Sequence, residues 1–317
     1  MRRGTSGINC LLAIDKPLGL TSHDVVSRVR RVLGERRVGH AGTLDPAASG
    51  VLVVGVGQAT RLLGMLTLDD KRYEARIAFG TQTSTDDVEG EVVLTRPVPE
   101  RLAEPGVAAA VVASLVGSCD QVPPAYSAIS VDGRRAYDRA RAGEEVELPV
   151  RHVTIHEAAL TGVETGDELV WLCSFHVSKG TYVRSIARDL GQSMGTAAHL
   201  AGLRRTASGP VGIDACLSLE ELEALGPSHV LKRALDPVKA LGLARHELTD
   251  RELEAALVGR AFGCQSVCDP DGTRRAPREC ERLALVRQGS LRGVWECRNQ
   301  RLSSVSNFPD GIEGVCS

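Results

Sequence analysis

Apolar and polar residues alternate along this chain in ways that predict both strands and helices. Residues 8–14 are mostly apolar and end at Asp15-Lys16-Pro17, and residues 51–56 are almost purely aliphatic, so both are predicted strands. Residues 71–79 alternate strictly and place Tyr73 on the inward face at the start of a strand, and residues 169–177 alternate in the same way. The chain is therefore expected to build a sheet from segments far apart in sequence.

A helical spacing of valine and leucine runs from Val25 to Leu33, after Thr21 or Ser22 as the N-cap and before Gly34 as the stop. Residues 101–116 also have a helical pattern. A further helix is predicted over residues 183–194, with Thr181 as its cap. Arg184 lies in the first turn of this helix, where a cation opposes the helix dipole, so a carboxylate partner is expected and Asp45 is a candidate.

Two later stretches have a different character. A Pro-led strand is predicted over residues 121–129, then a turn at Asp132-Gly133 and a short arginine-rich helix closed by Gly143. This insertion, about 121–148, is either a clamp on a ligand or an ordinary excursion at a sheet edge. From residue 236 to 317, short strand-like pieces alternate with Gly, Pro and Asp turns, which predicts a small β-rich second domain after a first domain over residues 1–235.

Composition changes this picture only locally. The 317 residues are 43% hydrophobic with a net charge of -2 and a pI of about 6.5, so the whole chain is not an evident nucleic-acid binder. The first 60 residues nevertheless hold eight bases against four acids. Five of the bases surround the first predicted helix, as a solvated face or as a phosphate-contacting patch: Arg28, Arg30, Arg31, Arg36 and Arg37.

Several classes of protein are disfavoured. The chain has no run of about 18 apolar residues, which a membrane-spanning helix needs, and its first residues do not resemble a secretory signal. The nine cysteines are scattered, so we expect reduced thiols and a cytoplasmic protein. The four late cysteines lack paired CxxC spacing, so a zinc site is not favoured over ordinary core and surface thiols.

The most reactive-looking stretch is residues 38–50. It combines three glycines with His40 and Asp45 and opens onto the aliphatic run at 51–56, a usual way to present a side chain from a rigid base. Asp45-Pro46 is also typical of a helix start. Ser49 lacks the spacing of a nucleophile elbow, and the glycines match no nucleotide-binding loop.

Taken together, these residues make the chain resemble the bacterial tRNA pseudouridine synthases of the TruB type. The motifs occur in the family's order over about the first 210 residues, and their joint occurrence is specific. They are Asp15-Lys16-Pro17-x-Gly19-x-Thr21-Ser22, Gly39-His40-x-Gly42-Thr43-Leu44-Asp45-Pro46-x-Ala48-x-Gly50, Lys71-Arg72-Tyr73, Pro123-Pro124-x-Tyr126-Ser127-Ala128, Lys179-Gly180-Thr181-Tyr182-Val183-Arg184 and Leu203-Arg204-Arg205.

The resemblance implies an α+β fold, with a mixed, mainly antiparallel central sheet, flanking helices and a C-terminal β-rich domain of the RNA-binding PUA type. It also implies isomerisation of a uridine in the T-loop of tRNA, at position 55, without a metal, nucleotide or redox cofactor. Asp45 would be the essential carboxylate, by covalent attack or by proton abstraction, and Arg184 would favour its ionised form.

The other implied site residues contact the base after it leaves its stack. Tyr73 and Tyr182 would touch the flipped base, Leu203 would form an apolar wall, and His40 would fill the vacated space or hold the rearranged loop. The chain departs from the family at Thr83-Ser84-Thr85, where Thr-Asp-Thr is usual, with Asp86-Asp87 following.

Two alternatives remain beside a stand-alone, monomeric tRNA enzyme. The catalytic subunit of a guide-RNA-directed pseudouridylation complex shares the Asp45 motif, although the insertion at 121–148 favours the stand-alone form. A non-catalytic tRNA-folding protein is the other alternative, but RNA binding alone would not require Asp45, Tyr73 and Arg184 together.

Overall fold

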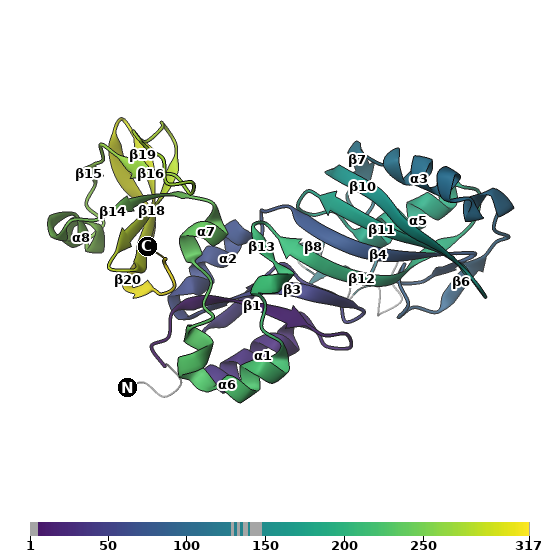
Figure 1. The fold of residues 1–317 in the computed structure, drawn as a ribbon, viewed down its shortest axis with the longest axis horizontal. Coiled ribbons are helices and arrows are strands. Elements are labelled where there is room, and N and C mark those ends of the chain that lie inside the picture. The colour runs from purple at the N-terminus through teal and green to yellow at the C-terminus, as the bar shows by residue number, and fades with distance from the viewer. Residues whose placement is uncertain (1–5, 128–129, 132–133, 136–138, 140–147, 317) are drawn as a thin grey trace. The chain divides into compact units, whose positions relative to one another are not determined.

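The computed structural model describes residues 6–127, 130–131, 134–135, 139 and 148–316 (Figure 1). The chain divides into two compact units. The first unit comprises residues 1–46, 50–68 and 207–317, and the second comprises residues 47–49 and 69–206. Each unit therefore draws on segments that are distant in sequence. Among the described residues, no helix is long and apolar enough to cross a membrane.

The first unit is built around β3 (Ala48–Val56), which pairs antiparallel with β1 (Cys10–Lys16) and with β2 (Val38–Ala41). Helix α1 (Ser22–Leu33) begins with a capping box between Thr21 and Asp24 and ends at Gly34, whose φ of 61° is left-handed. The other elements of this part are a 3-10 helix (Gly57–Leu62), α2 (Leu63–Leu66), β13 (Val211–Gly212), a 3-10 turn (Ile213–Ala215), α6 (Leu219–Leu231) and α7 (Pro237–Leu241).

The C-terminal part of the first unit is β-rich, as predicted. A seven-stranded sheet has the order β15-β20-β19-β18-β14-β16-β17, and among its described pairs only β14–β18 is parallel. Its elements are β14 (Ala244–Glu247), α8 (Asp250–Leu257), β15 (Phe262–Gly263), β16 (Val267–Cys268), β17 (Arg274–Arg275), β18 (Arg282–Arg287), β19 (Ser290–Arg298) and β20 (Arg301–Ile312).

Strand β1 is buried on both faces, which explains its nearly continuous apolar sequence. Cys10, Leu12 and Ile14 pack in the cluster formed with α1 and α6. The alternate residues Leu11 and Ala13 pack in a second cluster that includes side chains of β18, β19 and β20. The β-rich segment thus shares a core with the N-terminal strands, and the domain boundary near residue 235 stays a prediction.

The second unit is centred on β4 (Lys71–Phe79) and β11 (Leu169–Val177), which pair antiparallel with Tyr73 opposite Phe175. Apolar side chains of these strands form one core with α3 (Pro105–Ala113) and α5 (Val183–Ser193). Trp171 is fully buried there and donates its indole N–H to the Leu102 carbonyl at 2.9 Å. The remaining elements are β5 (Thr81–Thr83), β6 (Val92–Thr95), a 3-10 turn (Glu100–Ala103), β7 (Gly117–Gln121), β8 (Ser130–Val131), β9 (Arg134–Arg135), β10 (Arg151–Thr165) and β12 (Ala198–Ser208).

The predicted class, a mixed and mainly antiparallel sheet with flanking helices and a β-rich C-terminal part, is confirmed. Some boundaries were wrong. The strand predicted over 121–129 was wrong, because β7 ends at Gln121 and residues 122–127 form no strand: Pro123 and Pro124 lack the N–H that a ladder needs. Residues 134–135 are a strand rather than a helix, and most of the rest of the insertion lies outside the described residues. The 15-residue strand β10 was not foreseen.

Candidate active site

The loop that carries Asp45 is fastened to the start of α1 by one buried hydroxyl. Ser22 Oγ donates to the Leu44 carbonyl at 3.1 Å and accepts from the Leu44 N–H at 2.9 Å. Ser22 and Leu44 are both buried, so water does not compete for these bonds. Leu44, the residue before Asp45, is therefore fixed through both its N–H and its carbonyl.

A second fastening follows Asp45 directly. The Gly19 N–H donates to the Pro46 carbonyl at 2.9 Å. The turn that contains Gly19 is itself held by Lys16, whose buried ammonium donates to the carbonyls of Pro17 and Leu20 at 2.9 and 2.7 Å. This gives a structural reason for the Asp15-Lys16-Pro17-x-Gly19 sequence, because these residues brace the loop from outside.

No helix begins at Asp45, and this prediction was wrong. Pro46 and Ala47 form a turn, and β3 starts at Ala48. Gly42 has a φ of 82°, a left-handed conformation that favours glycine and lets the chain leave β2 and reverse direction. Asp45 is half-buried at this reversal, while His40 lies on β2 opposite Val54 and is also half-buried.

In the second unit, Tyr73 and Leu203 pack against the same core. Tyr73 lies at the beginning of β4 and Leu203 near the middle of β12, and both are only partly buried. Neighbouring strand residues such as Ala75 and Leu200 are buried, with only 3% of each residue's surface exposed. Each side chain therefore anchors one edge in the core and keeps another edge accessible.

Tyr182 is placed by its backbone. The Gln121 carboxamide accepts from the Tyr182 N–H at 2.8 Å and donates to its carbonyl at 3.1 Å. Tyr182, rather than Thr181, is the N-cap residue of α5, and Thr181 Oγ1 instead donates to the Ser178 carbonyl at 2.9 Å. The predicted cap was therefore wrong by one residue, because Thr181 completes the preceding turn.

Arg184 is buried in the first turn of α5, and the expected carboxylate partner is present in its own unit. Its guanidinium lies 3.5 Å from the Asp87 carboxylate. It also donates to the backbone carbonyls of Thr85 and Tyr126 at 3.1 and 3.0 Å. Both ionic side chains are nearly solvent-free, with exposures of 6% and 5%, so the two charges compensate each other where water hardly reaches them.

Asp87 is the functional candidate that the sequence did not reveal. Its carboxylate accepts from Thr85 Oγ1 at 2.5 Å and from the Glu89 N–H at 3.0 Å. The neighbouring Asp86 is paired with Arg188 at 2.9 Å, and burial raises the pKa of the Asp86 carboxyl against the lowering effect of that arginine. The sequence gives no sign that these two adjacent acids are buried, and only their burial in the structure points to their ion pairs.

Comparison with known proteins bears directly on this arrangement. Residues 30–183 match the TruB family pseudouridylate synthase N-terminal domain, and residues 184–241 match the tRNA pseudouridylate synthase B C-terminal domain. The tRNA pseudouridine synthase B of Mycobacterium sp. (strain KMS) is 43% identical over 293 residues, which cover 89% of this chain and 97% of that protein. The chain belongs to the tRNA pseudouridine synthase B family.

A second relative gives the same result at higher identity. The tRNA pseudouridine synthase B of Thermobifida fusca (strain YX) is 54% identical over 219 residues, which cover 68% of this chain and 74% of that protein. The resemblance predicted from the motifs is therefore confirmed, and with it the assignment of the chain to a family of uridine-isomerising enzymes. The individual site residues stay predictions.

Solved structures support the fold. The archaeal box H/ACA sRNP Nop10-Cbf5 complex contains a chain that aligns with a TM-score of 0.67 at 21% identity, covering 96% of this chain and 88% of that one. A Cbf5-Nop10-Gar1 complex aligns with a TM-score of 0.68 at 22% identity, covering 98% and 87%. At such identities the likeness concerns architecture alone.

The site residues are divided between the units. Asp45 and His40 belong to the first unit, and Tyr73, Tyr182, Arg184 and Leu203 belong to the second. The structure brings Arg184 together with Asp87, and it fixes the backbones on either side of Asp45 and Tyr182. The pairing of Arg184 with Asp45 stays a prediction.

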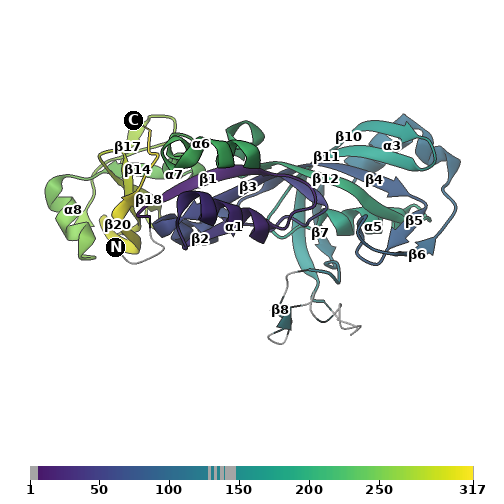
Figure 2. The same ribbon diagram turned by 90° about the horizontal axis from the view of Figure 1, so that it is seen from below.

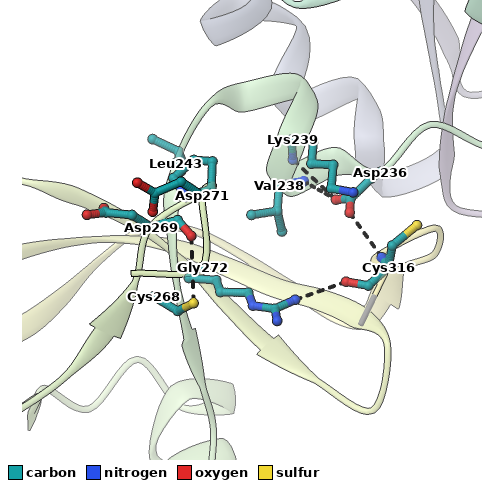
Figure 3. Close-up of a pocket in the computed structure, with 11 residues that line it drawn as sticks. Asp236, Val238, Lys239, Leu243, Cys268, Asp269, Asp271, Gly272 and Cys316 are labelled. Atoms are coloured by element: carbon teal, nitrogen blue, oxygen red, sulfur yellow. Dashed lines mark hydrogen bonds between the residues drawn. The ribbon is translucent and has the colours of Figure 1, made fainter. Parts of the chain in front are cut away.

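One hollow of the β-rich segment lies where hydrogen bonds fix the backbone of Cys316 (Figure 3). It has a volume of about 270 Å³ and is bordered by α7 and by residues 268–272. Arg245 donates to the Cys316 carbonyl at 2.9 Å, and the Asp236 carboxylate accepts from the Cys316 N–H at 3.0 Å (Figure 3). These bonds hold the end of the chain against α7. Among the residues described, no group of three His, Cys, Asp or Glu side chains is arranged to hold a metal.

Proposed function

We propose that this protein converts a uridine in the T-loop of tRNA, at position 55, to pseudouridine, with Asp45 as the catalytic carboxylate. The observation that carries the proposal is the match to a tRNA pseudouridine synthase B over 97% of that protein's length, together with the doubly anchored loop that presents Asp45. A loop fixed immediately before and after one half-buried carboxylate suits a residue that must meet its substrate in a defined geometry.

The reaction needs no net gain or loss of atoms. The N1–C1′ bond of the uridine breaks, the base turns, and a C5–C1′ bond forms, while C5 loses a proton and N1 gains one. Asp45 would act by attack on the nucleoside or by abstraction of a proton, and either role requires its ionised form. A guanidinium favours that form, which is the role we assign to Arg184.

The remaining residues would receive the base after it leaves its stack. Tyr73 and Tyr182 would contact the flipped uracil, Leu203 would provide an apolar wall, and His40 would fill the gap or support the rearranged loop. Asp87 would act through Arg184 by holding the guanidinium in place, and it is thus a positioning residue. The partly exposed states of Tyr73 and Leu203 are consistent with these roles.

The same proposal includes the domain organisation, the oligomeric state and the cellular compartment. Residues 1–235 would form the catalytic domain, residues 121–148 a segment that clamps RNA, and residues 236–317 a PUA-like RNA-binding domain acting on the T-arm. We further propose a monomer in the cytoplasm. All nine cysteines are free thiols, which suits a reducing compartment.

The decisive experiment is incubation of the purified protein with an unmodified tRNA transcript, followed by pseudouridine mapping. One modified position in the T-loop is expected. Modification elsewhere, or only in the presence of an added guide RNA, would contradict the proposal. Binding of tRNA without any product would support the non-catalytic alternative instead.

A further inference from the structure

Three exposed arginines gather where α1 ends and β2 begins: Arg31, Arg36 and Arg37. We call this set the α1–β2 corner. Helix α1 and strand β2 lie side by side in the first unit (Figure 2). The corner lies on the same short path of chain that continues through His40 to Asp45.

The outward direction of the corner is fixed by packing. Val25, Val26, Val29 and Leu33 are buried on the inner face of α1, so Arg31 points away from that core. The turn after Gly34 is held by its backbone, because the Gly57 N–H donates to the Arg37 carbonyl at 2.7 Å and the Val38 N–H donates to the Arg36 carbonyl at 3.1 Å. Arg36 and Arg37 are therefore presented from a fixed backbone.

The only acid within the corner does not neutralise these arginines. Glu35 is buried, and its carboxylate accepts from the N–H groups of Ser6 and Arg37 at 2.9 and 3.0 Å. The Glu35 carboxylate is thus occupied by backbone N–H groups. Glu35 shapes the corner without forming a recorded ion pair with a guanidinium.

Several other described arginines are instead paired with an acid. Arg28, one turn earlier on α1, pairs with Glu223 at 3.2 Å, and Arg76 pairs with Glu164 at 2.5 Å. Within the described part of the chain, no ion pair is recorded for Arg31, Arg36 or Arg37. Three unneutralised guanidiniums in one place are the electrostatic footprint of a polyanion site.

We propose that the α1–β2 corner binds phosphates of the RNA backbone next to the nucleotide that Asp45 modifies. This rests on the proposed function, because it assumes that the substrate is RNA. The eight residue steps from Arg37 to Asp45 span at most about 29 Å when extended, so the corner serves phosphates close to the reactive nucleotide rather than a remote part of the RNA. Guanidinium groups suit this task because they bind phosphate oxygens through two N–H groups at once.

The test compares Arg31→Ala/Arg36→Ala/Arg37→Ala with the wild type for tRNA binding over a range of salt. Each phosphate contact contributes about 0.7 to 0.9 to the slope of log affinity against log salt. The triple variant should lower that slope by about 2 to 3 and weaken binding roughly 10- to 100-fold at low salt. The single-turnover rate at saturating enzyme should stay near the wild-type value.

Two control variants separate local contacts from net charge and from misfolding. Arg28→Ala removes one charge from the same helix, but that charge is already paired with Glu223, so tRNA affinity should change little. Arg31→Lys/Arg36→Lys/Arg37→Lys keeps the charge and should restore most of the salt slope. An Ala variant with the wild-type melting temperature, affinity and salt slope would overturn the inference. The same result would be expected if the corner bound an acidic protein instead of RNA.

That failure is distinguishable from failure of the proposed function. If the wild type forms pseudouridine in the T-loop but the corner variant binds normally, only the corner assignment is wrong. If the wild type forms no pseudouridine at all, the function is wrong whatever the salt slope.

Discussion

The Asp45 loop and the Arg184 turn are both held rigidly, but by different kinds of interaction. The Asp45 loop is fastened by neutral hydrogen bonds from Ser22 and Gly19 to backbone groups. The Arg184 guanidinium is held by a buried ionic partner, Asp87, and by two backbone carbonyls. The bonds made directly to the Asp45 loop therefore come from uncharged groups, whereas Arg184 is held partly by an opposite charge.

This difference has a physical consequence. A neutral bond that is lost leaves one or two backbone groups unsatisfied, whereas a broken buried ion pair leaves an uncompensated charge in a medium of low polarity. The groups that bond directly to the loop, Ser22 Oγ and the Gly19 N–H, are uncharged, so they do not themselves compete with the substrate for the carboxylate. An ionic anchor suits Arg184 because it fixes the direction of a long, flexible side chain.

The largest expected effect concerns Asp45 itself. Asp45→Asn keeps the shape of the side chain but removes its charge and nucleophilicity, so turnover should fall on the order of 10⁴-fold or more. Single-turnover pseudouridine formation measures the rate, and a filter-binding assay should give nearly unchanged tRNA affinity. A near-normal rate for Asp45→Asn would remove Asp45 from the mechanism.

The second prediction breaks the ionic anchor. Asp87→Asn removes the buried carboxylate 3.5 Å from the Arg184 guanidinium and should lower the free energy of unfolding by about 3 kcal/mol, measured with urea. Activity should fall as well, because the guanidinium is no longer fixed. Glu164→Gln removes the partner of exposed Arg76 and should change stability by less than about 1 kcal/mol. Equal effects of the two variants would contradict the distinction between buried and exposed pairs.

A third prediction uses pH to test a charged anchor in the β-rich part of the chain, His246 on β14. Burial disfavours the charged form of His246, but its hydrogen bonds to the Cys264 sulfur and the Ser266 carbonyl and the charge of Glu252 outweigh it and raise the pKa of His246 to about 9. Its stabilising contribution is therefore complete below the unfolded value of 6.5 and is lost as the pH rises through 9.

Urea unfolding of the wild type between pH 6.5 and 9.5 should show this loss, on the order of 2 kcal/mol. His246→Gln should be less stable at pH 6.5 and should show a much flatter profile over the same range. An identical pH dependence in both proteins would show that His246 is not a charged anchor.

The smallest expected effect concerns the neutral anchor. Ser22→Ala removes both hydrogen bonds to Leu44 and should lower the free energy of unfolding by about 1 to 2 kcal/mol. The single-turnover rate should fall roughly 10-fold or more, because the carboxylate is less well positioned. Thr21→Ala is the matched control, since it removes the neighbouring α1 cap at a similar cost of about 1 kcal/mol without touching Leu44. A similar loss of rate in both variants would attribute the effect to α1 rather than to the loop.

Much of the fold could be predicted because local patterns agree with tertiary demands. The helical spacing from Val25 to Leu33 and its stop at Gly34 appear in α1, and the alternation around Tyr73 appears in β4. The strand β10 escaped prediction, since its sequence mixes polar and small residues and its partners β7 and β11 supply the pairing. Asp45-Pro46 favoured a helix locally, but the bonds from Ser22 and Gly19 select a turn into β3.

The sequence by itself determined the family and the order of the motifs, and it named the candidate residues for the chemistry. These depend on residue type and spacing, which the chain displays directly. Only the tertiary structure decided that Asp87 compensates Arg184, that Ser22 holds Leu44, and that Glu35 leaves the corner arginines unneutralised. Whether a charged group is buried, and which partner it meets, depends on segments far apart in the chain, and no local pattern encodes that outcome.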